Sequence, residues 1–160
     1  MNHMKKLTNR IALIVLTTLP LSINAFADDS NKTMEQQFTE LNKLNIVYAK
    51  CNTVATGSGI TDKAAQTGLS KTFFSEMLKN HKKMVKLGLE GEPEAFNFFL
   101  ELMTADMLAA FFMGTNIVEV NGMVKKDMES LYEKYNFDWK LVHTELWETY
   151  KCNEVYSKLK

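Results

Sequence analysis

The chain has 160 residues and a formal net charge of zero at pH 7, with 19 basic and 19 acidic side chains. Arg10 is the only arginine, and arginine is the side chain best suited to bidentate recognition of phosphates and guanine bases. The composition therefore argues against nucleic-acid binding. A single proline after residue 20, Pro93, and many helix-forming side chains argue against a β architecture with many turns.

The first 27 residues have the three parts of a secretory signal peptide. Three basic residues lie within the first ten, an apolar run follows, and Ala-Phe-Ala at 25–27 precedes two aspartates. The apolar segment 11–27 contains Pro20, and it is shorter than the about 20 residues that a spanning helix needs. The sequence therefore predicts cleavage after Ala27 and export to the periplasm, rather than an uncleaved membrane anchor.

The remainder of the chain, residues 28–160, is predicted to form a single domain. Removing 27 residues from 160 leaves 133, which is long enough for one hydrophobic core. The leader takes three basic residues with it, so 16 basic residues remain against 19 acidic ones and the net charge becomes −3. We therefore expect a mildly acidic exported protein.

The two cysteines, Cys51 and Cys152, are expected to form a disulfide. An even cysteine count in an oxidising compartment favours a bond over two free thiols. The chain has no Cys-x-x-Cys pair, which a redox catalyst would normally use. The predicted bond is therefore structural.

The first helix is predicted over residues 33–56, where apolar side chains recur at three- and four-residue steps. Thr33 followed by Gln36 fits a capping box. Gly-Ser-Gly at 57–59 supplies the stop. Both ends of this helix are therefore marked, and it carries Cys51.

The second helix is predicted over residues 62–87, with Thr61 as its N-cap and Gly88 at its end. Its apolar face contains phenylalanine, methionine, leucine and valine, and one polar side chain, His81. We expect this histidine to lie in the core or at an interface. The lysines on the other side are expected to form a solvated surface.

The third helix is predicted over residues 93–113, beginning at Pro93 and stopping at Gly114. Its phenylalanines and leucines favour membrane insertion by about 4 kcal/mol in sum, whereas Glu101 and Asp106 oppose it by about 2.5 to 3.5 kcal/mol each. We expect a buried central helix and no stable membrane insertion after cleavage. An apolar ligand pocket or a partner surface is the alternative.

The fourth helix is predicted over residues 117–135, with Asn116 in a capping pattern. A competing interpretation places a short strand at its start, turning at Asn121 and Gly122, but the sustained helical spacing favours a helix. The fifth helix is predicted over residues 138–159. The fold class is therefore all-α: a compact bundle of about five helices whose first and last members are joined by the disulfide.

Asp106 and His81 are polar side chains at apolar positions of predicted helices. A carboxylate on an apolar face must find hydrogen-bond donors, take a raised pKa, or face another chain. If the second and third helices form an antiparallel hairpin, Asp106 lies level with Ser75. His81 then lies level with Leu100, which is six residues or about 9 Å along the axis from Asp106, so direct pairing of His81 with Asp106 is not expected.

No metal or cofactor is predicted, because zinc needs three or four ligands and the histidines and carboxylates show no ligand spacing. His143 is expected on a helix surface. The chain also lacks a nucleophile elbow and a phosphate-binding glycine loop.

The leading hypothesis is a non-catalytic periplasmic protein that binds another protein, as an inhibitor or immunity-type factor. One alternative is a carrier or chaperone-like protein that binds an apolar small molecule through a Phe/Met-rich helix. Another is a small enzyme of unknown reaction built around Asp106, His81 or His143. The candidate functional or interface residues are Asp106, His81, Phe98, Phe99, Phe111 and Phe112.

Overall fold

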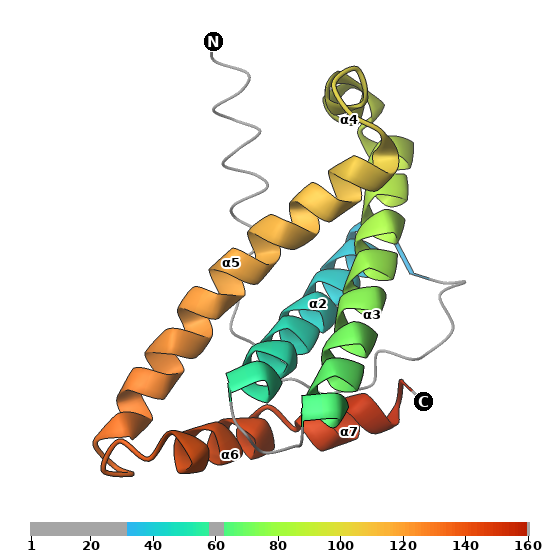
Figure 1. Cartoon of the computed structure of the whole chain (residues 1–160). Coiled ribbons are helices and arrows are strands. Elements are labelled where there is room, and N and C mark those ends of the chain that lie inside the picture. Colours follow the sequence, from blue (N-terminus) through green and yellow to red (C-terminus); the bar gives the residue numbers. More distant parts are fainter. Residues whose placement is uncertain (1–31, 58–62, 160) are drawn as a thin grey trace. The chain divides into compact units, whose positions relative to one another are not determined.

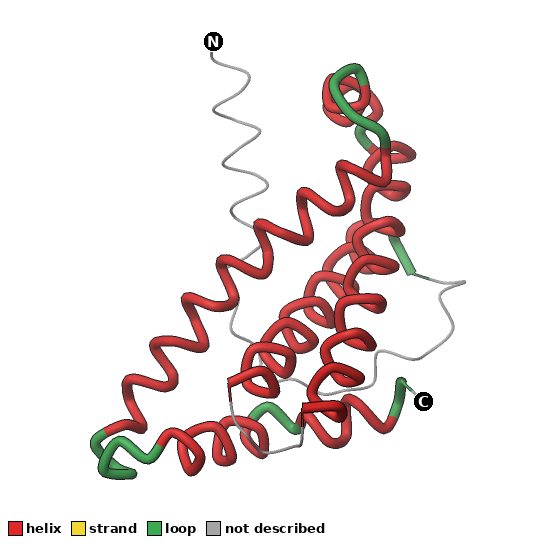
Figure 2. The backbone as a smooth tube through the Cα atoms, viewed as in Figure 1, coloured by secondary structure: helices red, strands yellow, loops and turns green. Residues whose placement is uncertain are grey.

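The computed structural model describes residues 32–57 and 63–159. All regular structure in these residues is helical (Figures 1 and 2), which confirms the predicted all-α class. The helices are α2 (Met34–Gly57), α3 (Lys63–Gly91), α4 (Pro93–Leu100), α5 (Ala105–Tyr132), α6 (Trp139–Thr149) and α7 (Cys152–Ser157). The predicted signal peptide and the predicted cap Thr61 lie outside the described residues.

The chain divides at Glu40 into two units, and the first turn of α2 belongs to the first of them. There the predicted capping box is confirmed. The Gln36 backbone N–H donates to Thr33 Oγ1 (3.2 Å), and the Thr33 backbone N–H donates to Gln36 Oε1 (2.9 Å). Two backbone donors that helix geometry leaves unpaired are thereby satisfied.

In the second unit, from Leu41 onward, α2 and α3 pack antiparallel (Figure 1). Asn45 contacts His81, whereas Tyr48, one turn later in α2, stacks near Phe73, earlier in α3, with ring centroids 6.1 Å apart. The larger hydrophobic cluster, which we call the disulfide core, is built from five helices. Its buried residues are Tyr48, Ala49, Cys51, Val54, Ala55, Leu69, Phe73, Met77, Val120, Val124, Met128, Val142, Leu146, Trp147, Cys152 and Val155.

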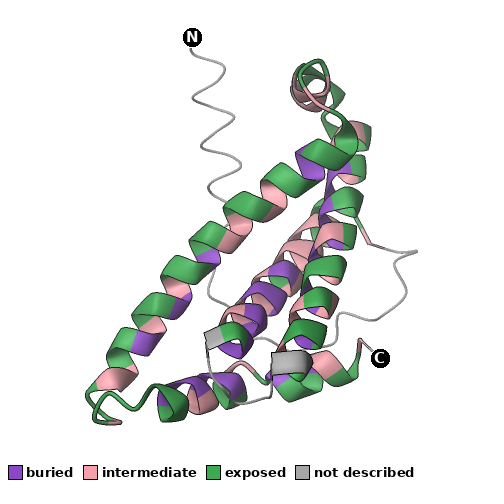
Figure 3. Ribbon diagram, viewed as in Figure 1, coloured by how far each residue is buried: buried purple, intermediate pink, exposed green. Residues whose placement is uncertain are grey.

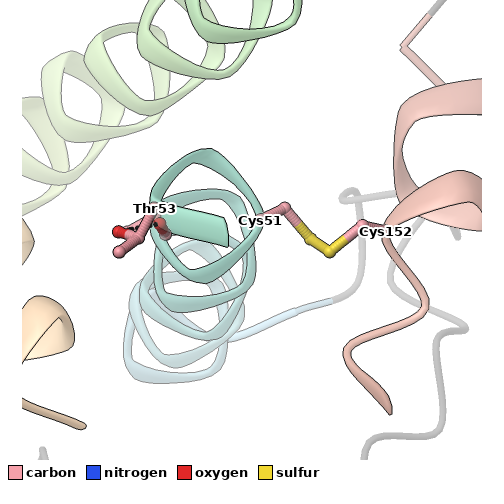
Figure 4. Close-up of a disulfide and its surroundings, with 4 residues drawn as sticks. Cys51, Thr53 and Cys152 are labelled. Carbon is pink, nitrogen blue, oxygen red and sulfur yellow. Dashed lines mark hydrogen bonds between the residues drawn. A yellow bond between two sulfur atoms is a disulfide. The ribbon is translucent and has the colours of Figure 1, made fainter. Parts of the chain in front are cut away.

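The predicted disulfide between Cys51 and Cys152 is confirmed, and it joins α2 to α7 (Figure 4). Both cysteines are fully buried. Thr53 points to the opposite side of α2 (Figure 4), where its hydroxyl lies within hydrogen-bond distance of two acceptors, Ala49 O (2.9 Å) and Asn121 Oδ1 of α5 (2.5 Å). One end of α2 is therefore tied to α7 on one side and to α5 on the other.

The predicted helix over 93–113 has the wrong end, because the structure divides this segment into two helices. The break lies at residues 101–104, and α5 begins at Ala105 with Thr104 as its N-cap, whose hydroxyl accepts from the Met107 backbone N–H (3.2 Å). An N-cap threonine satisfies a donor that would otherwise lack a partner. The single glycine at 114, by contrast, costs a helix interior only about 1 kcal/mol, so α5 continues through it.

The predicted start of a fourth helix after Asn116 is also wrong, because α5 continues through Gly114 and runs unbroken to Tyr132. The strand interpretation is also wrong, because Asn121 and Gly122 lie within α5. Residues 117–132 are helical, as the apolar spacing predicted, but the predicted end at residue 135 is wrong, because residues 133–137 form turns.

The predicted fifth helix is divided in two, which gives six helices in the described residues. The Asp138 cap is confirmed: its carboxylate accepts from the backbone N–H groups of Lys140 (3.0 Å) and Leu141 (3.2 Å). The helix breaks at Lys151, whose φ is +55°, a left-handed conformation that non-glycine residues seldom adopt. The break comes immediately before Cys152, so α7 starts at the residue that bonds to α2.

Candidate functional site

The reversal from α3 into α4 depends on Gly88. Predicted as the end of a helix, Gly88 lies inside α3. A Cβ added there would lie 2.1 Å from Phe96 Cζ, so the ring of Phe96 occupies the space that a side chain would fill. Pro93 starts α4 as predicted, because a proline at the first helical position lacks only a donor that has no helical partner.

The four phenylalanines singled out from the sequence are brought together by α4 and α5. Their ring centroids form a series: Phe98 to Phe99 (5.7 Å), Phe99 to Phe112 (6.3 Å) and Phe112 to Phe111 (5.9 Å). These separations suit favourable aromatic pairs. The break at 101–104 produces this arrangement, since it lets α4 and the start of α5 lie against each other.

The inner and outer rings of this series differ in exposure. Phe99 and Phe112 are half-buried and pack against a second, smaller hydrophobic cluster, the tip cluster, whose buried residues are Val85, Leu108 and Ala109. Phe98 and Phe111 are 58% and 53% exposed. The inner rings therefore hold two outer rings that face solvent.

Two further apolar side chains at the same junction, Leu102 and Met107, are exposed. Neither residue was identified from the sequence, because the predicted helix over 93–113 runs through both without a break. The signal that would have found them is Thr104, a good N-cap residue two or three positions away from each. We call these two residues together with Phe98, Phe99, Phe111 and Phe112 the phenylalanine surface.

Asp106 lies in the first turn of α5, where a carboxylate is favourable. Its side chain is exposed and its Oδ1 lies 3.1 Å from Lys82 Nζ. The expectation that it lies level with Ser75 is wrong, because the break at 101–104 shifts the register of α5 along α3. An exposed pair of this kind contributes about 0 to 1 kcal/mol, so Asp106 marks the edge of the phenylalanine surface rather than a buried acid.

His81 lies apart from that surface, buried between α2 and α3. Its Nδ1 lies 3.1 Å from Asn45 Nδ2 and 2.8 Å from Met77 O, and Asn80 Nδ2 donates to Asn45 Oδ1 (3.1 Å). Burial lowers the pKa of His81, and the hydrogen bond to Met77 O offsets part of that effect. The structure thus places His81 at a helix interface, as expected, and does not pair it with Asp106.

The expectation of a surface position for His143 is wrong. This side chain is buried, and its Nδ1 lies 3.1 Å from the carbonyl oxygen of Val54. A buried imidazole needs such a partner. His143 therefore joins α6 to the end of α2.

A polar cluster beside the disulfide joins three segments. The Tyr150 hydroxyl donates to Asp127 Oδ2 (2.5 Å), and Lys50 Nζ lies 3.7 Å from the same oxygen and 4.5 Å from the Tyr150 ring centroid. Burial and the hydrogen bond with Asp127 raise the pKa of Tyr150. The phenol therefore stays protonated at neutral pH and can donate to Asp127, so the cluster ties Lys50 of α2 and Tyr150, at the end of α6, to Asp127 of α5.

Within residues 32–57 and 63–159, no three histidine, cysteine, aspartate or glutamate side chains are grouped to hold a metal ion. In the same residues α5 is the one helix long and apolar enough, by length and composition alone, to cross a membrane. Five of its residues are buried in the molecule: Leu108, Ala109, Val120, Val124 and Met128.

The sequence matches no protein-family model, no curated protein and no solved structure.

Proposed function

We propose that this chain is a non-catalytic exported protein that binds another protein through the phenylalanine surface, as an inhibitor or immunity-type factor. The exposure of Phe98 and Phe111 at the ends of a packed ring series carries the proposal. Aromatic side chains and methionine are enriched in protein interfaces, and contiguous exposed apolar residues mark interaction sites.

Preorganisation supports the same function. A side chain that is already held in place loses little conformational freedom on binding. Phe98 is held by Phe99, which packs on Phe112. The inner rings lie against each other, and Phe112 also contacts Phe96, which favours an outward-facing protein contact over an apolar ligand held among the rings.

The test is photo-crosslinking in intact cells, with a photoreactive side chain at residue 98. The matched control is Phe137, which is also exposed (65% against 58%) but lies in the turn between α5 and α6. We expect one specific crosslinked protein from position 98 and none from position 137. The same purified partner should bind the Phe137→Ser variant normally and the Phe98→Ser variant about tenfold or more weakly.

Two results would overturn this proposal. Equal crosslinking from both positions would show that exposure alone, and not the phenylalanine surface, determines the contact. An apolar small molecule that co-purifies with the native chain and is lost in the Phe98→Ser variant would favour a carrier. The inhibitor form of the proposal further requires that the purified chain lower the partner's own activity.

A further inference from the structure

The phenylalanine surface lies in a part of the chain whose charged side chains are all acidic. Residues 87–124 carry six acidic side chains and no basic one, whereas the other residues of 28–160 carry 13 acidic and 16 basic side chains. This segment contains the end of α3, all of α4, the break at 101–104 and most of α5. Figure 3 shows exposed residues along α4 and the start of α5. The exposed apolar side chains of this surface therefore share their segment with negative charge alone.

Two acidic side chains flank Phe98 on its own side of α4. Glu94 lies one turn before it and Glu101 lies about one turn after it, a spacing that places all three on one side of a helix. Both glutamates are exposed. Neither forms an ion pair with another residue of 32–57 or 63–159. Phe98 is thus an exposed apolar ring between two unpaired carboxylates.

Two lysines of α3 neutralise part of the negative charge, and each already has an acidic partner. Lys82 Nζ lies 3.1 Å from Asp106 Oδ1, and Lys86 Nζ lies 3.8 Å from Glu90 Oε1. These pairs leave the two glutamates beside Phe98 without a cation. The α4 side of the phenylalanine surface therefore keeps its negative charge.

We infer that the partner of the phenylalanine surface is cationic: it presents an apolar contact with lysine or arginine side chains beside it, placed to meet Glu94 and Glu101. The inference rests on the proposed function, since it specifies the chemistry of the protein bound there. A charge that loses water beside an apolar contact is unfavourable unless an opposite charge meets it. Complementary charge also speeds the encounter and disfavours partners of the wrong sign.

The same charges argue against a lipid surface as the occupant. Exposed phenylalanine, leucine and methionine would suit a membrane, but protein segments that lie on membranes carry lysine and arginine beside their apolar residues. Anionic lipids attract those basic residues, and residues 87–124 contain none. The occupant that fits both the apolar and the acidic side chains is a cationic protein surface.

Two labelled probe peptides test the charge preference with the purified chain as cells produce and process it. One is an amphipathic helix of leucine and lysine, and the other has glutamate in place of every lysine. Fluorescence anisotropy should show that the leucine–lysine peptide binds about tenfold or more tightly than the other, and Phe98→Ser should weaken its binding. Equal binding of both peptides, or binding of neither, would overturn the inference.

Two double variants assign the preference to the glutamates beside Phe98. Glu94→Gln/Glu101→Gln should weaken binding of the leucine–lysine peptide about threefold or more. The matched control, Glu148→Gln/Glu154→Gln, removes the same charge from exposed residues of α6 and α7 and should leave binding unchanged. Circular dichroism checks that both variants keep the helices of the parent. Equal weakening by both would show that net charge alone decides binding, and would overturn the inference.

Photo-crosslinking in cells from residue 98 separates this inference from the proposed function. The specific crosslink should become weaker in the Glu94→Gln/Glu101→Gln background. It should match the parent in the Glu148→Gln/Glu154→Gln background. An unchanged crosslink in both backgrounds would overturn the inference and leave the proposed function standing, whereas no crosslink in the parent would refute the proposed function itself.

Sedimentation tests two other occupants. Phosphatidylglycerol vesicles should leave the parent chain unbound, and the chain alone should sediment as a monomer. Vesicle binding that Phe98→Ser removes would make a lipid surface the occupant. Self-association that Phe98→Ser removes would make it a second copy of the chain. Either of these two results would overturn the inference.

Discussion

The two hydrophobic clusters of the chain differ in how completely they are enclosed. The disulfide core takes buried residues from α2, α3, α5, α6 and α7 and contains the Cys51–Cys152 bond. The tip cluster has three buried residues, Val85, Leu108 and Ala109, and is otherwise lined by half-buried side chains, phenylalanines among them. Large apolar side chains are thus enclosed in one cluster and left partly open to solvent in the other.

This difference separates stability from binding. Burial of apolar surface contributes about 25 cal/mol per Å², so the enclosed rings of the disulfide core contribute most to folding. An exposed ring such as Phe98 contributes little to folding, and its apolar area stays open to the proposed partner. Substitutions in the two clusters should therefore act on different measurements.

The largest effect is expected from removing the disulfide. The double variant Cys51→Ala/Cys152→Ala should lower the free energy of unfolding by about 4 to 5 kcal/mol, because the bond closes a loop with a sequence separation of 101. Urea unfolding measures the loss. A loss below about 1 kcal/mol would show that packing alone holds α7 on α2, and that the disulfide does not distinguish the two clusters.

A matched pair of phenylalanine substitutions compares the clusters directly. Phe73→Ala should cost about 3 to 5 kcal/mol, since Phe73 is fully buried between Tyr48 and Tyr156, each with a ring centroid 6.1 Å away. Phe98→Ala should cost less than about 1 kcal/mol. Thermal unfolding of both variants checks this, and similar costs would show that Phe98 is a folding residue rather than a binding residue.

Two glycines of α3 give the next comparison. Gly88→Ala should destabilise the chain by about 1 to 3 kcal/mol, because its new methyl group would collide with the Phe96 ring. Gly68→Ala, where a Cβ meets nothing within 4 Å, should stabilise it by about 0.4 to 1 kcal/mol. Denaturant unfolding gives both values, and a stabilising Gly88→Ala would mean that Phe96 moves away freely.

Features with a chemical signature of their own were predictable from the sequence. The Thr33–Gln36 capping box needs only four consecutive residues, and the Asp138 cap binds N–H groups within three positions. The disulfide was predicted from the even cysteine count and the expected oxidising compartment, and the structure contains it. Each of these has a chemical signature that does not depend on the rest of the fold.

Features decided by packing were not predictable. Gly88 and Gly114 resemble helix ends in sequence, yet both lie inside helices. At Gly88 the ring of Phe96 occupies the space of a side chain, and at Gly114 an added Cβ would meet nothing within 4 Å. The four phenylalanines were identified as candidates, but a phenylalanine looks the same in sequence whether it is buried or exposed. The break at 101–104 has a local signal, Thr104 as an N-cap, but the packing of α4 against α5 decides which phenylalanines stay exposed.

The smallest effect concerns pH and the buried His81. Burial lowers the pKa of His81 in the folded chain, whereas the unfolded chain has an ordinary value of about 6.5. Below that pH the unfolded state binds a proton that the folded state excludes. The free energy of unfolding should therefore fall as pH drops below about 6.5, by at most about 1.4 kcal/mol per pH unit, and level off below the folded pKa.

Substitution of His81 assigns that pH dependence to the α2–α3 interface. The glutamine of His81→Gln cannot gain a proton. The slope of the unfolding free energy against pH below about 6.5 should therefore become shallower by up to about 1.4 kcal/mol per pH unit. Lys83→Gln, an exposed change two residues away, should leave the slope as it was. An unchanged slope in His81→Gln would show that the interface admits a charged imidazole. In that case a charged His81 beside the disulfide core would not destabilise the fold. The disulfide core and the tip cluster would then differ less in how fully they exclude water than the burial of His81 suggests.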